Sequence, residues 1–485
     1  MSLSVALNSA RSSLLATAKQ IAVSGRNITG ANDPNYTRKI ALPTVAADGS
    51  VTVSVSRATD LALFYRMLGS NSAATGQQAL LDGLNRLQDS VGDSADGTSP
   101  ASLIGALSDA LQAEANAPTD RNLAQATVTA AQAVVSSLNS ASRTVQAVRN
   151  DADAAMATSV GKINDLLGQF QKLNDSIVHG TTAGEDVSAA LDQRDAILGQ
   201  LTDEMGVTVV ARANNDVAIY TDSGVPLFDK IARTVTFQPN SPLTAGADGN
   251  AVLVDGVPVT GANATMPLRA GKLAGLAALR DQIAPTFQAQ LDETARGLIA
   301  SFAESDQSGG GGADRTGLFA YSGAPAVPAS GTAGLAVSIS VNPAVDPSQG
   351  GSLDRLRDGG INGVNYQYNA TGATSFADRL TEIAAALGAT RSFDSSSGLQ
   401  ANATLADFST ASVSWLEDQR KSTSTAVDYH SALLTRASEA LSNATGVNMD
   451  DEYAHQLQLE QSYQASAKLI NVVNQLYQAL FDAVK

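Results

Sequence analysis

The stretch LSVALNSARSSLLATAKQIAVSGRNITG, residues 3–30, decides the fold because its mostly apolar positions recur at alternating spacings of four and three. This heptad spacing places one stripe along a single face of a helix. The members of the N-terminal stripe are Leu3, Leu7, Ala10, Leu14, Thr17, Ile21, Ser24 and Ile28. A helix with one apolar face needs another surface to cover it. The pattern therefore predicts a long amphipathic helix with a partner helix, ending at the turn-forming segment GANDPNY.

A second heptad stripe lies at the other end of the chain, in a helix expected from Asp450 to Val484. Its members are Tyr463, Ala467, Ile470, Asn474, Tyr477, Phe481 and Val484, and a second apolar edge comprises Leu469, Val472, Leu476 and Leu480. Asn474 is the polar member at a predicted core position. A lone asparagine in a coiled-coil core costs stability and can fix register; the sequence leaves open whether it does so here. We expect the two terminal helices to pair with each other and with neighbouring subunits.

The middle of the chain is also mostly helical. Helical periodicity runs from Pro118 to His179, which corresponds to roughly 90 Å of straight helix. Its predicted buried stripe comprises Val134, Leu138, Ala141, Val145, Val148, Ala152 and Ala155, followed after a one-residue slip by Ile163, Leu167, Phe170 and Ile177. We interpret this stripe as the inner face of a helical bundle within one subunit. A further helix is expected from Val187 to Met205.

Alternating β-branched residues interrupt the helices in a few places. A strand is predicted at residues 50–58 after a loop, and a small β domain is predicted from Gly206. The fold class is therefore mainly α with inserted β: a long antiparallel helical bundle built from both chain ends, with coiled-coil terminal helices and an outer β domain. The expected division is residues 1–60 and 445–485 for the terminal core; 61–205, 271–306 and 354–444 for the bundle; and 206–270 and 307–353 for the outer β-rich region.

Composition excludes several classes of function. Lysine plus arginine number 31 and aspartate plus glutamate 47, and the resulting net charge of −16 repels nucleic acids and anionic membranes. The chain has no cysteine, so disulfides and thiol chemistry are absent. The N-terminus lacks the pattern of a cleaved secretory signal, and no window is apolar enough to span a membrane.

No residue pattern points to catalysis. The three histidines lie far apart among polar neighbours, outside metal-ligand motifs. Asp450, Asp451 and Glu452 open a predicted helix, where the helix dipole favours negative charge, and this reading is preferred over paired acid-base carboxylates. We therefore expect a protein that is not an enzyme and has no cofactor or metal.

Several segments resemble a known family. ANDPNYTRK, residues 31–39, is similar to the N-terminal motif of flagellar rod, hook and hook-associated protein 1 subunits; the matching residues are Asn32, Pro34, Tyr36, Thr37 and Arg38. The segment from Thr445 to Leu480 resembles the C-terminal helix of the same proteins, with Ser466 where asparagine is commoner. PTDRNLAQATVTAAQ, INDLLGQFQKLNDSI, LDQRDAILGQLTDEMGVTVV and GKLAGLAALRDQIAPTFQAQLD resemble the hook-associated protein 1 family in particular.

This resemblance implies a structural subunit at the junction of hook and filament. It implies a homo-oligomer in contact with hook protein on one side and hook-associated protein 3 on the other, and an export chaperone bound at the C-terminal helix. The protein would be extracellular, in the flagellum, and exported without a cleaved signal. Another axial protein (hook, rod or hook-associated protein 3) and an extracellular adhesin remain alternatives.

The heptad stripes and the resemblance together predict where subunits meet. For Pro34 and Tyr36, ending the first helix is already a sufficient role, and the resemblance adds assembly. The predicted assembly interface comprises Leu3, Leu7, Ala10, Leu14, Ile21, Ile28, Asn32, Pro34, Tyr36, Tyr463, Ala467, Ile470, Asn474, Tyr477 and Phe481.

Overall fold

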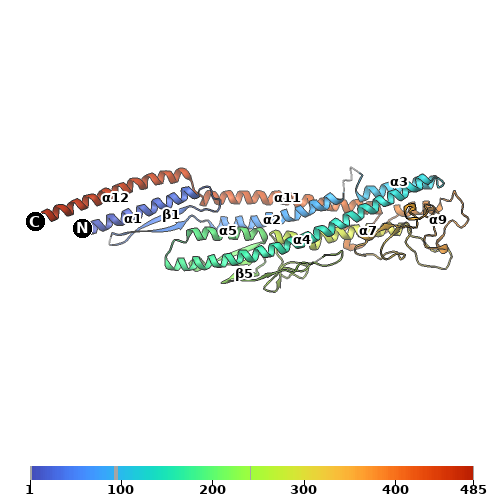
Figure 1. The fold of residues 1–485 in the computed structure, drawn as a ribbon, viewed down its shortest axis with the longest axis horizontal. Helices are drawn as coiled ribbons and strands as arrows, with labels where there is room; N and C mark the ends of the chain where they lie inside the picture. Colours follow the sequence, from blue (N-terminus) through green and yellow to red (C-terminus); the bar gives the residue numbers. More distant parts are fainter. Residues whose placement is uncertain (1–2, 48, 92–96, 241, 484–485) are drawn as a thin grey trace.

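The computed structural model describes residues 3–47, 49–91, 97–240 and 242–483. The molecule is elongated, and both chain ends lie at the same end of it (Figure 1). Long helices run along its length, so the predicted class, mainly α with inserted β, is confirmed. In the described part of the chain, every helix is too short or too polar to cross a membrane.

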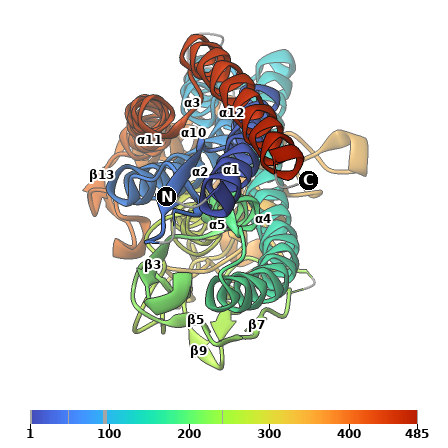
Figure 2. The ribbon, with the colours of Figure 1, turned by 90° about the vertical axis from the view of Figure 1, so that its left-hand side faces the viewer.

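The terminal part consists of two helices and a hairpin. Helix α1 (Leu3–Gly30) runs antiparallel to α12 (Met449–Ala483), and both project beyond the rest of the molecule (Figures 1 and 2). Strands β1 (Lys39–Val45) and β2 (Val51–Arg57) pair antiparallel from Lys39↔Arg57 to Val45↔Val51. The strand predicted at 50–58 is confirmed by β2. The segment before it, expected to be a loop, contains strand β1. Helix α1 contacts both α12 and the hairpin.

The larger part, here called the body, is a bundle of long helices. Its main helices are α2 (Leu61–Val91), α3 (Pro100–Asn116), α4 (Arg121–Ala183), α5 (Ser188–Glu204), α7 (Ala284–Ser301) and α11 (Leu405–Thr445). The short helix α6 (Lys272–Ala278) joins α7 through a π-helical turn, η2 (Leu279–Ile283). Helix α2 packs along α11, and α3 along α4.

Helix α4 confirms the prediction of one very long central helix. It has 63 residues, beginning after Asp120, whose carboxylate accepts a hydrogen bond from the Asn122 backbone N–H, and ending at Gly184 in the left-handed conformation. Its predicted stripe is buried except for half-buried Ala155: Val134, Leu138, Phe170 and Ile177 are all 0% exposed. The stripe is therefore the inner face of an intramolecular bundle.

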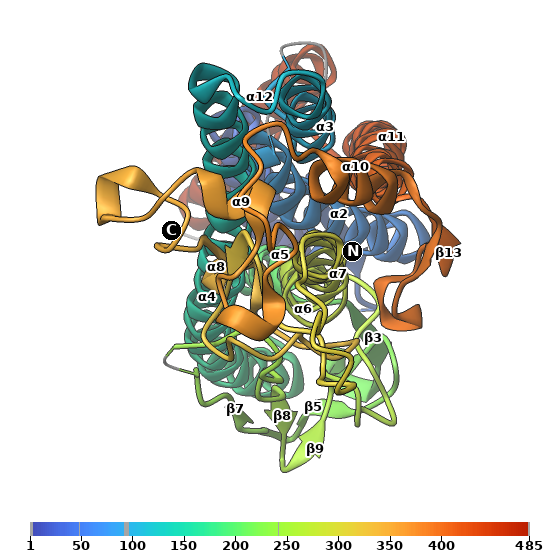
Figure 3. The ribbon, with the colours of Figure 1, turned by 90° about the vertical axis from the view of Figure 1, so that its right-hand side faces the viewer.

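The β insertion lies along one side of the helices (Figure 3). One antiparallel sheet has the order β3 (Val207–Ala211), β4 (Val217–Thr221), β5 (Pro226–Asp229), β6 (Ile231–Ala232). A second has the order β7 (Val235–Thr236), β8 (Leu253–Val254), β9 (Val257–Pro258). A 3-10 turn, η1 (Ala213–Asn215), connects β3 to β4.

The expectation that residues 307–353 form part of an outer β-rich region is wrong. Strands there are limited to β10 (Phe319–Ala320) and β11 (Ser340–Val341), beside the short helices α8 (Leu335–Ser338) and η3 (Pro347–Gln349). The glycine run at 309–312 and four prolines after it disfavour long strands, because proline cannot donate a ladder hydrogen bond. Leu318, Phe319 and Val345 are instead buried in the main core.

Short elements complete the body. They are α9 (Asp354–Asp358), η4 (Val364–Tyr366), α10 (Asp378–Gly388), β12 (Arg391–Ser392), η5 (Ser395–Ser397) and β13 (Asn402–Ala403). Helix α10 packs against α3 and α7, so this part of the chain closes the end of the bundle far from the termini (Figure 3).

Candidate assembly site

The seam between α1 and α12 is narrow and partly polar. On α12 the buried residues include Leu459, Ser466 and Val473, which are seven positions apart and face α1, the element against which α12 mainly packs. On α1 the buried residues include Ala16, Thr17, Val23 and Ser24. Small side chains let the two helix backbones approach each other closely. The seam therefore buries less apolar surface per turn than the inner face of α4.

The structure places most of the predicted interface residues at the edges of this seam. Half-buried members are Leu7, Ala10, Leu14, Ile21, Ile28, Tyr36, Ala467, Ile470 and Tyr477. Exposed members are Asn32, Pro34, Tyr463, Asn474 and Phe481. The side chain of Leu3 and all of Val484 lie outside the described residues.

The predicted core position of Asn474 is wrong for the seam within one subunit. Val473, the preceding residue, is buried there, and Asn474 points to solvent. One residue turns a helix by about 100°. Burying the valine gains hydrophobic free energy, whereas a buried asparagine would need hydrogen-bond partners.

A row of exposed apolar side chains runs along α12, mainly on the flank beside the buried seam residues. Its members and their exposed fractions are Leu457 61%, Leu469 58%, Val472 50%, Leu476 52% and Leu480 54%. This exposed row includes the whole second apolar edge found in the sequence. Contiguous apolar patches are uncommon on soluble monomers and typically mark interaction surfaces.

The loop after α1 explains several residues of the ANDPNYTRK motif. The Tyr36 ring lies over Gly30, so close that a Cβ at Gly30 would be 2.6 Å from a ring carbon. The Asp33 carboxylate accepts a hydrogen bond from the Asn35 backbone N–H, which stabilises the turn around Pro34. Burial raises the pKa of Tyr36 to about 12, opposed by Arg26, so its hydroxyl stays protonated and donates to Asn27 Oδ1 at 2.9 Å.

Glu452, at the start of α12, is a buried carboxylate that connects the two terminal helices to the loop. It is 1% exposed. Its Oε2 accepts from Ser24 Oγ at 2.9 Å, and its Oε1 accepts from Asn27 Nδ2 at 3.1 Å and Arg38 Nε at 2.7 Å. The sequence predicted that Glu452 opens a helix, and it does lie in the first turn of α12. Its side chain also turns inward, toward donors that lie more than 400 residues away in sequence.

A second carboxylate, Asp192 of α5, holds the same loop from the body side. It forms an ion pair with buried Lys39 and accepts from Thr37 Oγ1 at 2.6 Å and Arg57 Nη1 at 3.1 Å. Arg57 Nη1 also lies 2.7 Å from Asp195 Oδ2. Burial lowers the pKa of Lys39, opposed by its hydrogen bond to Asp192, and burial raises the pKa of Asp195, opposed by Arg57.

With this geometry established, comparison with known proteins shows what the chain is similar to. A family model described as the flagellar hook-associated protein FlgK helical domain matches residues 84–318. A second, the flagellar basal body rod FlgEFG protein C-terminal model, matches residues 438–483. Flagellar hook-associated protein 1 of Bacillus subtilis is 22% identical over 97% of this chain and 96% of that protein.

Together these matches support the flagellar hook-associated protein 1 family for this chain. The chain is therefore a structural component of the flagellum. Flagellar hook-associated protein 1 of Escherichia coli is 24% identical over 62% of this chain, and that of Salmonella typhimurium is 25% identical over 57%. These two alignments span 57% and 52% of the relatives' own lengths.

A solved structure titled as the flagellar hook junction protein FlgK from Burkholderia pseudomallei also matches. The match covers 53% of this chain and 46% of that chain, at 23% identity and a TM-score of 0.43. The rod-type C-terminal model covers all of α12 within the described residues, together with the end of α11. The family relationship thus includes the helix that carries the exposed apolar row.

The residues that join the terminal helices to the body were mostly missed by sequence reasoning. Lys39, Arg57, Asp192 and Asp195 are charged residues that form no recognisable motif. Asp192 and Asp195 lie within a segment that carries the family resemblance, which was the available signal. Their partners are more than 130 residues away, so only the folded chain brings them together.

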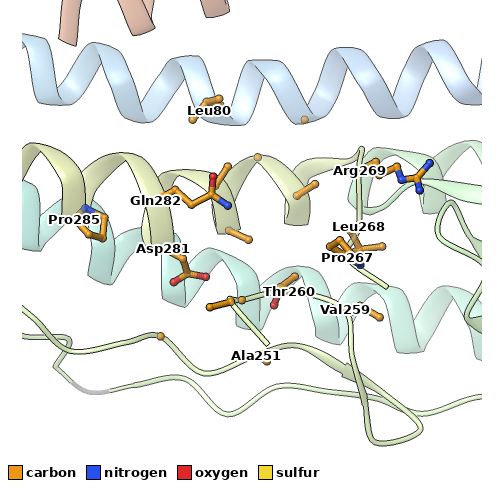
Figure 4. A pocket seen from close by; sticks show the side chains of 18 of the residues that line it. Leu80, Ala251, Val259, Thr260, Pro267, Leu268, Arg269, Asp281, Gln282 and Pro285 are labelled. Atoms are coloured by element: carbon orange, nitrogen blue, oxygen red, sulfur yellow. The ribbon is translucent and has the colours of Figure 1, made fainter. Parts of the chain in front are cut away.

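A groove with a volume of about 810 Å³ lies between α2, the α6–η2 helix and the β insertion (Figure 4). Leu80, Thr260, Leu268, Asp281 and Gln282 are among its lining residues. The Asp281 carboxylate is engaged by the neighbouring Arg280 at 2.7 Å. Within the described ranges, no group of three or more histidine or acidic side chains is arranged to hold a metal ion.

Proposed function

We propose that this chain is a junction subunit between the flagellar hook and filament, and that it assembles through α1 and α12. The observation that carries the proposal is the exposed row on α12, Leu457 to Leu480, on a helix that projects from the body. Burying five such side chains, each 50–61% exposed, between subunits would contribute about 1 kcal/mol each by transfer of apolar surface. The names of the relatives support the flagellar context.

Each part of the chain would have its own place in this assembly. Residues 1–60 and 445–485 would form the wall of a tubular assembly of identical subunits. Residues 61–205, 271–306 and 354–444 would form the surrounding bundle, with residues 206–270 outermost and 307–353 joined to the bundle core. The exposure of Asn32, Pro34, Tyr463, Asn474 and Phe481 supports a contact between these predicted interface residues and a neighbouring copy.

The partners proposed for the two ends of this assembly are hook protein and hook-associated protein 3. Before assembly, an export chaperone would cover α12, whose exposed apolar row is a liability in a free subunit. Export would proceed without a cleaved signal, to an extracellular position in the flagellum. The proposed role is mechanical and not enzymatic.

A gene deletion tests the junction role directly. Electron microscopy of flagella from deleted and complemented cells would show whether hooks form without filaments. Bare hooks, together with filament protein in the medium, are the expected result, because the filament would lack its attachment layer. Absent hooks would indicate a rod or hook subunit, and intact filaments would overturn the proposal.

A further inference from the structure

The terminal part and the body do not share an apolar core. Among the described residues, the main core extends from Phe64 to Leu416 and contains no residue of α1, β1, β2 or α12. Between the two parts, β2 against α5 is the most substantial packing. The terminal part is therefore held to the body by something other than hydrophobic contact.

Two short segments cross between the parts. Residues 58–60 connect β2 to α2, and residues 446–448 connect α11 to α12. Backbone hydrogen bonds link the two crossings through Arg38, whose N–H donates to Thr445 O at 2.8 Å and whose carbonyl accepts from Ala58 N at 2.8 Å. Segments this short and close together have the geometry of a hinge.

Most side-chain contacts at this hinge converge on two buried carboxylates, and an ion pair between Arg26 and Asp186 at 3.1 Å also joins α1 to the body. Glu452 engages Ser24, Asn27 and Arg38, and Asp192 engages Thr37, Lys39 and Arg57. Both carboxylates thus act on the segment 37–39, from opposite sides of the joint. Directional hydrogen bonds fix orientation in a way that a sliding apolar contact does not.

Space for movement lies beside the hinge. A groove of about 880 Å³ is lined by the 31–37 loop, the start of α2, α5 and residues 441–448 at the end of α11. Its walls belong to both parts, so rotation about the crossings would narrow or widen it.

We propose that Asp192 and Glu452 form a two-point latch that fixes the angle between the terminal helix pair and the body. With both carboxylates in place, one orientation is strongly favoured. Loss of either one removes the directional bonds that hold segment 37–39, so the joint loses its fixed orientation; it also leaves a buried cation or amide without its acceptor. The use of a fixed angle in a junction subunit rests on the proposed function. The latch itself is a property of the single chain and can be tested without that function.

Distance measurement between two spin labels on the isolated protein tests the latch. The chain has no cysteine, so Asn8→Cys on α1 and Ser176→Cys on α4, both exposed, would be labelled uniquely. A single narrow distance distribution is expected for the otherwise unchanged chain. Asp192→Asn and Glu452→Gln should each broaden it or add a displaced population, and the double variant should broaden it further.

Matched controls separate the latch from general charge effects and from unfolding. Asp451→Asn on α12 and Asp175→Asn on α4 remove exposed carboxylates and should leave the distribution unchanged. Asp192→Asn combined with Lys39→Met removes the stranded charge and should still show the broadened distribution, with body unfolding followed by circular dichroism. An unchanged distribution in the Asp192 and Glu452 variants of a folded protein would overturn the latch. That result would not affect the junction proposal, which depends on assembly in cells.

Discussion

Helix α4 and the terminal pair of α1 and α12 carry the same kind of heptad stripe, yet their surroundings differ. The α4 stripe is buried against other helices of its own subunit, with Val134, Leu138 and Val145 at 0% exposure. The α12 seam buries Ser466 and Glu452 beside Leu459, and leaves the apolar row at Leu469 to Leu480 uncovered. A stripe thus indicates that a helix needs a partner, but not whether the partner belongs to the same chain.

The largest expected effect concerns assembly. Ile470→Asp or Leu14→Asp should abolish incorporation into flagella, because a carboxylate would be buried without a partner between helices. Thermal unfolding of the body should remain unchanged, since neither residue belongs to its core. Filament attachment in complemented cells provides the measurement, with Ser176→Asp on the exposed face of α4 as control. Normal filaments with either variant would show that the terminal helices, contrary to prediction, do not need their apolar stripes for assembly.

Hydrogen exchange should separate the two regions in the free monomer. Amides of residues 5–28 and 460–482 are expected to exchange on the order of 100-fold faster, or more, than those in the centre of α4, because the terminal seam buries little apolar surface. Mass spectrometry of the isolated chain provides the measurement. Strong protection of both terminal segments in the monomer would show that the pair is stable before assembly.

A cavity in the α4 stripe should destabilise the body alone. Leu138→Ala is expected to lower the free energy of unfolding by about 2–5 kcal/mol, because a fully buried leucine leaves a void. Val473→Ala in the terminal seam should leave the unfolding midpoint of the body unchanged. Denaturant titration followed by circular dichroism of the two variants tests this, and equal shifts would mean that the two regions unfold as one.

The smallest expected effect concerns pH. Burial raises the pKa of Asp292 on α7 to about 6, although the backbone N–H groups of Ala336 and Gly334 and the side chain of Gln288 oppose the shift. A carboxyl whose pKa is raised in the folded state destabilises that state at pH 7, and this penalty disappears as the pH falls through 6 toward 3.8. The contribution is at most about 3 kcal/mol over that interval.

Asp292→Asn should therefore flatten the pH dependence of body stability between pH 7 and 4, relative to the unchanged chain. Urea unfolding at several pH values provides the comparison. Asp175→Asn, which removes an exposed carboxylate from α4, is the matched control. Parallel curves of stability against pH for the Asp292 variant and the unchanged chain would show that burial does not raise the pKa of this carboxyl.

Much of this architecture could be predicted from local patterns. The four-three spacing determined the extent of α1, α4 and α12, and turn residues determined where α1 and α5 end, since helix periodicity and backbone stereochemistry act over a few residues. Alternation of valines at 51, 53 and 55 determined β2. The pairing strand β1, with Pro43 in its middle, lacks that alternation and needed its partner to be recognised.

What only the tertiary structure decided is which surfaces meet. The choice of Val473 over Asn474 for the seam depends on the direction from which α1 approaches, a difference of one residue that a heptad count cannot resolve. The burial of Glu452 and Asp192 depends on donors at Ser24, Arg38, Lys39 and Arg57, which come from distant parts of the chain. Ion-pair and hydrogen-bond partners depend on distances in the folded chain, and the local sequence does not contain these distances.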